Sequence, residues 1–482
     1  METIGISCSH YILDEDECVF FILIFFDLWT LNFVPIFVKI RAKRKYICVS
    51  FGLLGKNGYF CTTKRKYLYI IMFISSIKVS GFTNIEQATV YDTMSSAFVA
   101  PNNYGKSNML AAIEFGTRLM CASESGKRQM MQDVSKMPIN KAIEYKDFTF
   151  EIEGTCDIDG VLTSYCYGYS FAWDHDGKSG GIKTEYLKAK QEGDPKFKLL
   201  VSREDTGSFL CVPSITGRCN KKYQIGNAML AINQLESNPD LFYSPLLRQL
   251  TSISVPYLDT LDNPNIYFSA DGRNGIDLLD GSTISAYLYK LKTQDAENFN
   301  LLKSGIMQLL PNLESFEPTE ISLGDGIASK VYDIRVKEWN NSLSTSIRQM
   351  SSGSKRVIFI LTMCMVANVK SIPMLLIEEP ENSIHPRLLQ KLLTCMRGIA
   401  TETKVVMTSH STYLMRYFDA GRIYLGLPNE QGLATFARLK PGKVKAIYRR
   451  ASEMDITFGE YMYELLLDME DNKELANELF QK

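Results

Sequence analysis

The pattern of hydrophobic and polar positions changes in kind along the chain. Residues 147–210 alternate with the period of two that is typical of strands, as in FTFEIEG and SYCYGYSFAW. Apolar residues recur at helical spacing in 106–120, and 223–313 is mainly helical in pattern, with AMLAINQLE as an example. Two short apolar strands, 374–377 and 404–409, follow. This order predicts an α/β core divided by a long insertion that is first β-rich and then helical.

These patterns divide the chain into four parts. Residues 1–71 show no sustained period over much of their length, whereas 72–215 contain a strand, a loop, a helix and the β-rich segment. Residues 216–320 form a mainly helical insertion, and 321–482 return to the α/β core and end in a helix. We find no internal repeat and no low-complexity linker, and the length favours one to three globular domains.

The first part leaves three interpretations open. Cys18–Val38 is an apolar run with one acid, followed by a basic cluster, which fits a membrane span with its basic end inside the cell. A signal peptide fits less well, because acids precede the run and no small-residue cleavage site follows it. We favour a start codon extended upstream of Met72, because the mixture of Phe, Tyr, Ile, Lys and Cys is typical of translated non-coding DNA. An unusual N-terminal domain is the third interpretation.

Composition narrows the class of protein. With 45% hydrophobic and 22% charged residues, the chain can bury a large core and is too apolar for disorder. Its 53 basic and 54 acidic residues give a net charge of -1, so any DNA contact needs a local basic patch. Four of the 11 cysteines lie within residues 1–71, and the other seven show neither metal-ligand nor disulfide spacing, so we expect a reducing, cytoplasmic compartment.

A strand, a loop and a helix meet at the sequence APNNYGKSN. Backbone N–H groups and the positive end of the helix dipole would converge there, which is how phosphate groups are bound. Lys106 would reach the phosphate oxygens and Ser107 would bind Mg²⁺. A chance GKS at a helix start is the alternative. The residues expected to bind the nucleotide are Asn102, Asn103, Gly105, Lys106, Ser107 and Asn108.

One position of this loop departs from the usual pattern. The motif GxxxxGK[ST] begins with glycine, whereas this chain has Ala100. If φ is positive at that position, alanine costs about a kcal/mol or more; if φ is negative, it costs little. The sequence leaves both possibilities open.

A second group of candidate residues follows the apolar strand 374–377. Glu378 and Glu379 come directly after it, at the end of a strand where α/β sheets bind their ligands. Successive strand residues point to opposite sides, so the two carboxylates would have different roles. We assign Glu378 to the Mg²⁺ site and Glu379 to polarising the attacking water. A solvated strand end is the simpler alternative.

Two further motifs stand on either side of this strand. Ser351, Ser352 and Gly353 precede the apolar helix RVIFILTMCMVANV, where hydroxyl residues and a glycine form either a helix cap or an anion site. Downstream, KVVMTS leads into His410, which is either functional or a hydrogen-bonded structural histidine.

The order of these motifs resembles the ABC-type ATPase heads of the RecF/SMC/OLD group, particularly stand-alone AAA15/AAA21-type proteins. The motifs are GKS, then SSGS, then an apolar strand followed by EEPE, then a strand followed by SH. The resemblance covers most of Met72 to about Leu467, including IKVSGF and TFGEYMYELLL. It implies a P-loop ABC-type head that binds ATP and Mg²⁺. The departures are Ala100, the signature MSSGS in place of leucine-serine-glycine-glycine-glutamine, and Glu378 where most such proteins have aspartate. The family's glutamine loop cannot be placed.

The resemblance also implies how these residues act. Two heads would enclose two ATP molecules, with Ser351, Ser352 and Gly353 of one head closing over the γ-phosphate in the other. Glu379 would be the hydrolytic base and His410 the γ-phosphate switch. Only about 70 residues follow His410, without the acidic clusters of an OLD nuclease domain, and long heptad arms are not evident. The insertion is also far longer than transporter ATPases carry.

Three hypotheses follow. The first is an ATP-hydrolysing homodimer or higher oligomer that couples head closure to DNA or to a separate nuclease or other effector protein, in phage defence or DNA repair. The second, motivated by Ala100, is an ATP-binding switch or scaffold that hydrolyses ATP weakly. The third is a membrane-tethered ATPase that uses Cys18–Val38, although a membrane partner is not expected.

Overall fold

The computed structural model describes four strands within residues 1–53 and most of residues 72–481. Within 72–481, the residues that it does not describe are 92–94, 159, 176–179, 260–283, 323–329, 428–430 and 469–477. The four strands are β1 (Ile6–Asp14), β2 (Glu17–Ile24), β3 (Ile36–Lys43) and β4 (Tyr46–Leu53), which pair in order as an antiparallel sheet. The run Cys18–Val38 thus falls partly on β2 and β3, and its residues 25–35 lie outside the described residues.

A seven-stranded sheet forms the core of the part of the chain that begins at residue 72, with the order β14-β18-β19-β7-β20-β21-β22. The neighbours from β14 to β20 are parallel, and β21 and β22 are antiparallel. Buried residues on both faces explain the continuous apolar runs of these strands. Their bounds are β7 (Ser95–Val99), β14 (Tyr257–Leu258), β18 (Met374–Glu378), β19 (Lys404–Ser409), β20 (Ile423–Leu427), β21 (Thr435–Leu439) and β22 (Phe480–Gln481).

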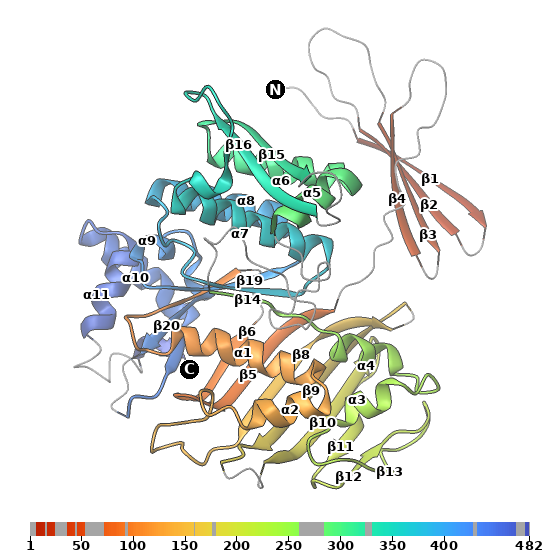
Figure 1. Cartoon of the computed structure of the whole chain (residues 1–482). Helices are drawn as coiled ribbons and strands as arrows, with labels where there is room; N and C mark the ends of the chain where they lie inside the picture. The colour runs from red at the N-terminus through yellow and green to blue at the C-terminus, as the bar shows by residue number, and fades with distance from the viewer. Residues whose placement is uncertain are drawn as a thin grey trace. The chain divides into compact units, whose positions relative to one another are not determined.

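Helices cover both faces of this sheet (Figure 1). On one side lies α1 (Lys106–Cys121), and on the other lie α7 (Ser352–Val369) and α8 (Pro386–Ile399). Within the described part of the chain, α7 has the length and composition of a membrane span, but 67% of it is buried inside the protein. A core helix has the same properties, and α7 packs against α6, α8 and β18.

The other face of α1 packs against an eight-stranded sheet of order β13-β12-β11-β10-β9-β8-β5-β6. Phe115 of α1 enters an aromatic cluster with Phe82, Phe148, Phe171 and Trp173, in which ring centroids lie 4.9–6.4 Å apart. The strands are β5 (Phe73–Phe82), β6 (Ile85–Tyr91), β8 (Phe148–Ile158), β9 (Val161–Ala172), β10 (Gly181–Gln191), β11 (Lys198–Arg203), β12 (Ser208–Cys211) and β13 (Lys221–Gln224). Helix α1 therefore joins the two sheets.

The remaining elements complete the insertion and the C-terminal part. Strands continue past the expected boundary at residue 215 to the end of β13, and the polar stretch NGIDLLDGS lies outside the described residues. Before the core resumes come α2 (Glu124–Met131), α3 (Ala231–Glu236), α4 (Ser244–Thr251), α5 (Ile284–Gln294), α6 (Ala296–Leu309), β15 (Leu313–Ser322), β16 (Lys330–Glu338), β17 (Thr345–Ser346) and η1 (Ile347–Gln349). Later come α9 (Thr412–Met415), η2 (Ala420–Arg422), α10 (Pro441–Glu453) and α11 (Phe458–Asp468).

Gly116 sets how closely α1 approaches the eight-stranded sheet. A Cβ atom there would lie 2.1 Å from Cδ2 of the fully buried Phe150, and Tyr169 donates a 2.7 Å hydrogen bond to the Gly116 carbonyl. We therefore expect Gly116→Ala to destabilise the fold by about 2 kcal/mol, because a packed core tolerates added volume poorly. Thermal unfolding followed by circular dichroism should show a lower Tm.

The matched control is Gly398→Ala in α8, where an added Cβ would meet no atom within 4 Å. Alanine favours a helix over glycine by about 1 kcal/mol, so this variant should keep or raise the Tm. Equal Tm values for the two variants would contradict the close approach at Gly116.

Candidate functional site

The loop between β7 and α1 has the geometry of an anion-binding turn. Gly105 caps α1 in the left-handed region at φ 81°, and a Cβ there would lie 2.5 Å from Cβ of Ala434. Ala100 is buried, and it is not among the residues with positive φ. Its Cβ lies 2.5 Å from where a Cβ of Gly426 would stand, so a glycine on β20 leaves room for the alanine methyl group. Ala100 therefore causes no left-handed strain.

Lys106 lies in this loop with its ammonium group turned toward the backbone. Its Nζ donates to the carbonyl oxygens of Ala100 at 2.8 Å and Pro101 at 3.1 Å. Burial lowers the pKa of Lys106, against the opposing effect of Glu379, Glu381 and Glu378. The two carbonyl groups that bind this buried ammonium could be replaced by phosphate oxygens.

Ser107 and Glu378 meet, as the sequence predicts for two Mg²⁺ ligands. The Ser107 hydroxyl donates to Oε1 of Glu378, and the Tyr257 hydroxyl donates to Oε2 of the same carboxylate. Burial, the hydrogen bond and the Glu378 charge raise the pKa of Tyr257, so it remains a donor. A hydroxyl beside a carboxylate is the hard oxygen donor set that Mg²⁺ prefers, so Ser107 and Glu378 fit this ion.

Glu379 is oriented by two side chains. Nδ2 of Asn382 donates to its Oε2 at 2.8 Å, and Nδ1 of His410 lies 3.1 Å from its Oε1. Burial opposes ionisation, but the hydrogen bonds from Asn382 and His410 and the charge of Lys106 outweigh it and lower the pKa of Glu379. An ionised, partly exposed carboxylate paired with a histidine can accept a proton from water.

The backbone at Glu379 is unusual. Its φ of 41° places a non-glycine residue in the left-handed region, where its N–H donates to the Thr408 carbonyl at 3.1 Å. Arg356 of α7 donates through Nη2 to the carbonyls of both Glu378 and Glu379, each at 2.8 Å. This buried arginine thus holds the strained turn that separates the two carboxylates.

The serine-glycine motif forms the start of α7. Ser351 caps the helix by accepting from the Ser354 N–H at 3.2 Å, so the helix-cap interpretation is realised. Ser352 is exposed beside it. A Cβ at Gly353 would lie 2.2 Å from the carbonyl oxygen of Ser383, so this position admits only glycine without rearrangement. The motif therefore packs directly against the turn that follows Glu379.

The other predicted residues lie in the same loop or at its edge. Asn102 and Asn103 are exposed, with Asn103 at φ 69°, and Asn108 donates to Oδ1 of Asn84 at 2.8 Å. Sequence reasoning missed Tyr257, Asn382 and Arg356. The only clue to Asn382 was its place in EEPEN, and an arginine ahead of an apolar helix gave no clue to its carbonyl partners.

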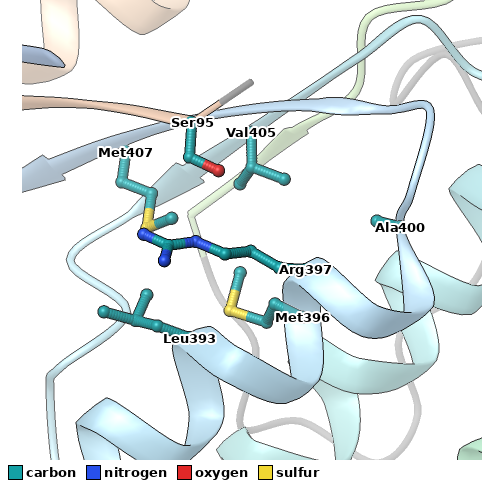
Figure 2. A pocket seen from close by; sticks show the side chains of 7 residues that line it. All are labelled: Ser95, Leu393, Met396, Arg397, Ala400, Val405 and Met407. Carbon is teal, nitrogen blue, oxygen red and sulfur yellow. The ribbon is translucent and has the colours of Figure 1, made fainter. Parts of the chain in front are cut away.

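A small pocket elsewhere on the core sheet is unrelated to this site. Ser95, Leu393, Met396, Arg397, Ala400, Val405 and Met407 line it, between α8 and strands β7 and β19 (Figure 2). Ser95 and Val405 stand near the N-terminal ends of their strands, whereas the phosphate loop and His410 follow the C-terminal ends. Ligands of open parallel sheets bind at the C-terminal ends.

A family model matches part of the chain. The family model described as "AAA domain, putative AbiEii toxin, Type IV TA system" matches residues 283–416. This stretch runs from α5 to α9 and contains the serine-glycine motif, Glu378, Glu379 and His410, while the phosphate loop precedes it. The match confirms the AAA21-type resemblance, and the observed sheets and helices confirm the α/β class. No curated protein matches the chain.

Several solved structures are also similar to the chain. The SMC head domain from Thermotoga maritima has 10% identity and a TM-score of 0.39, covering 77% of this chain and 100% of that one. A SmcHead bound to the C-winged helix domain of ScpA has 12% identity and a TM-score of 0.41, covering 78% and 99%. An Smc head with an extended coiled coil, bound to the C-terminal domain of ScpA and derived from Pyrococcus furiosus, has 11% identity and a TM-score of 0.41, covering 79% and 100%.

The role of Arg356 can be tested through stability. We expect Arg356→Gln to destabilise the fold by about 2–3 kcal/mol, because two carbonyls at a strained turn lose a charged donor. Thermal unfolding measures the effect. Lys355→Gln on the same helix is the control, and a Tm loss as large in the control would contradict the assignment.

Proposed function

We propose that this protein, which carries an AAA-family ATPase domain within residues 283–416, binds and hydrolyses ATP with Mg²⁺ between two copies of the chain. Closure of the two copies would act on DNA or on a separate effector protein such as a nuclease, in phage defence or DNA repair. The seven free cysteines among the described residues support a reducing, cytoplasmic location.

The observation that carries the proposal is the meeting of five side chains at one edge of one sheet. Lys106 and Ser107 follow β7, Glu378 and Glu379 stand at the end of β18, and His410 follows β19. Hydrogen bonds link Ser107 to Glu378 and His410 to Glu379. This arrangement of segments far apart in sequence supports the proposal of a phosphate-binding loop, metal ligands and a base in one place.

Each of these residues would have a separate role. Lys106 would exchange its loop carbonyls for the β- and γ-phosphates, and Ser107 with Glu378 would hold Mg²⁺. When bound, the ion supplies charge stabilisation to the phosphate oxygens. Glu379, ionised and fixed by Asn382, would orient the attacking water and accept its proton, while His410 holds the other carboxylate oxygen.

The serine-glycine motif supports a role for a second copy. Ser351 and Ser352 are exposed at the N-terminus of α7, where N–H groups and the helix dipole attract anions. We propose that this end binds the γ-phosphate held by the other copy. Gly353 and Arg356 of the same helix contact the turns around Glu379. Closure of the two copies would therefore affect the position of Glu379, the proposed base.

The second candidate function is a switch or scaffold with little hydrolysis. Its motivation was Ala100, and the backbone there shows no left-handed strain.

The central test is the ATPase rate of two variants. Lys106→Ala removes the cation that binds phosphate and Glu379→Gln removes the base, so kcat should fall at least about 100-fold in each. Release of inorganic phosphate measures the rate, and Lys222→Gln on β13 is the control.

Undiminished activity in both variants would contradict ATP hydrolysis at this site. Tight ATP binding in the wild-type protein, with turnover no faster than that of Glu379→Gln, would instead establish the switch.

Tyr257 gives a test of the metal site. Tyr257→Phe removes one hydrogen bond that orients Glu378, worth about 0.5–1.5 kcal/mol, so the Mg²⁺ concentration for half-maximal activity should rise about two- to tenfold. The readouts are this titration and Mg²⁺-dependent thermal stabilisation with a non-hydrolysable ATP analogue. Tyr223→Phe on β13 is the control. An unchanged Mg²⁺ dependence would refute this role.

A further inference from the structure

Helix α10 carries a concentration of positive charge that the ATPase site does not use. Within Pro441–Glu453 it has Lys443, Lys445, Arg449 and Arg450 against Glu453 alone, in a chain whose net charge is -1. Lys440 caps the helix. The whole chain is nearly neutral, so this segregation marks a local electrostatic surface.

Helical spacing gathers part of this charge on one face. Lys445, Tyr448, Arg449 and Ser452 stand at positions i, i+3, i+4 and i+7, and all four are exposed. The Arg449 side chain is 75% exposed and Tyr448 45%. The Tyr448 ring stacks on Phe458 at 4.5 Å, which fixes it in place. Residues on the opposite face, such as Ile447 and Ala451, are buried.

Among the described residues, Glu453 acts on Arg449 and Asp419 acts on Tyr448 of this face. Glu478 binds Lys443 at 2.6 Å, on the other side of the helix. Glu453 lies 3.5 Å from Arg449 in an exposed i,i+4 pair, which contributes little. Lys445 forms no ion pair with the part of the chain that the structure describes.

We propose that the face formed by Lys445, Tyr448, Arg449 and Ser452 binds the phosphate backbone of a nucleic acid. Lysine, arginine, tyrosine and serine are the side chains that contact phosphates in such complexes. A protein partner fits less well, because lysine is depleted in protein–protein interfaces. The inference rests on the proposed function in one respect, that the ATPase acts on a nucleic acid.

The surface is connected to the nucleotide site through packed helices. Helix α10 packs on α11, and α11 packs on α9, which begins two residues after His410. A nucleic acid held on α10 therefore lies one helix away from the segment that carries the switch histidine.

The test is fluorescence anisotropy with a labelled DNA duplex about two helical turns long, without nucleotide. Lys445→Glu with Arg449→Glu should weaken binding at least tenfold. Two phosphate contacts predict that the slope of log affinity against log salt becomes shallower by about two. A single-stranded DNA and an RNA duplex form parallel arms, which identify the preferred nucleic acid.

Two controls separate this surface from general charge and from misfolding. Lys221→Glu with Lys222→Glu on β13 makes the same change of charge and should bind like wild type. Lys445→Arg with Arg449→Lys keeps the charge and should also bind like wild type. Basal ATPase, measured without nucleic acid, should be unchanged in all variants.

Three results would overturn the proposal: no binding of any nucleic acid by the wild-type protein, equal losses in the β13 variant, or binding of poly-glutamate with none of nucleic acid. If ATPase activity is normal, any of these three results refutes the nucleic-acid surface and leaves the proposed ATP hydrolysis unaffected. Loss of ATPase in Lys106→Ala together with normal nucleic-acid binding supports both assignments. Undiminished ATPase in that variant refutes the proposed hydrolysis and leaves the surface.

Discussion

The hydrogen bond between Ser107 and Glu378 ties the site to the architecture of the core sheet, because it joins residues 271 positions apart. It requires β7 and β18 to end at the same edge of one parallel sheet. Strand β19 lies between them and is parallel to both, with Thr408 opposite Glu378 and Ser409 opposite Val99. The long insertion must therefore leave and re-enter the core without disturbing this register. Helix α1, packed on both sheets, makes that possible.

Small residues decide how closely the loops at this edge approach one another. Ala100 fits because β20 has a glycine opposite it, and Gly105 is required because Ala434 fills the space beside it. Exchanges of this kind preserve the volume of a packed layer while changing which strand carries the methyl group. The departure from the usual loop motif is therefore compensated by a residue more than 300 positions away, which explains why the motif alone could not settle its effect.

The sequence was informative where function follows directly from a local pattern. Lys106, Glu379 and His410 each follow an apolar strand by a few residues, so their meeting could be predicted from the geometry of parallel sheets. Tyr257 could not, because β14 has only two residues and no periodic pattern. Arg356 could not either, since its partners are carbonyl groups, which any residue has. Contacts between residues that are brought together only by the tertiary fold produce no recognisable local sequence pattern.

The charges of the site bear on how it would accommodate a triphosphate. Burial raises the pKa of Glu381, against the hydrogen bond from Ser409, whereas hydrogen bonds and Lys106 keep Glu379 ionised despite burial. Lys106, itself disfavoured as a cation by burial, faces Glu378, Glu379 and Glu381. A triphosphate would add several negative charges beside these carboxylates, and one ammonium group cannot balance them. Mg²⁺ between Ser107, Glu378 and the phosphates would offset this repulsion, so nucleotide and metal are expected to bind together.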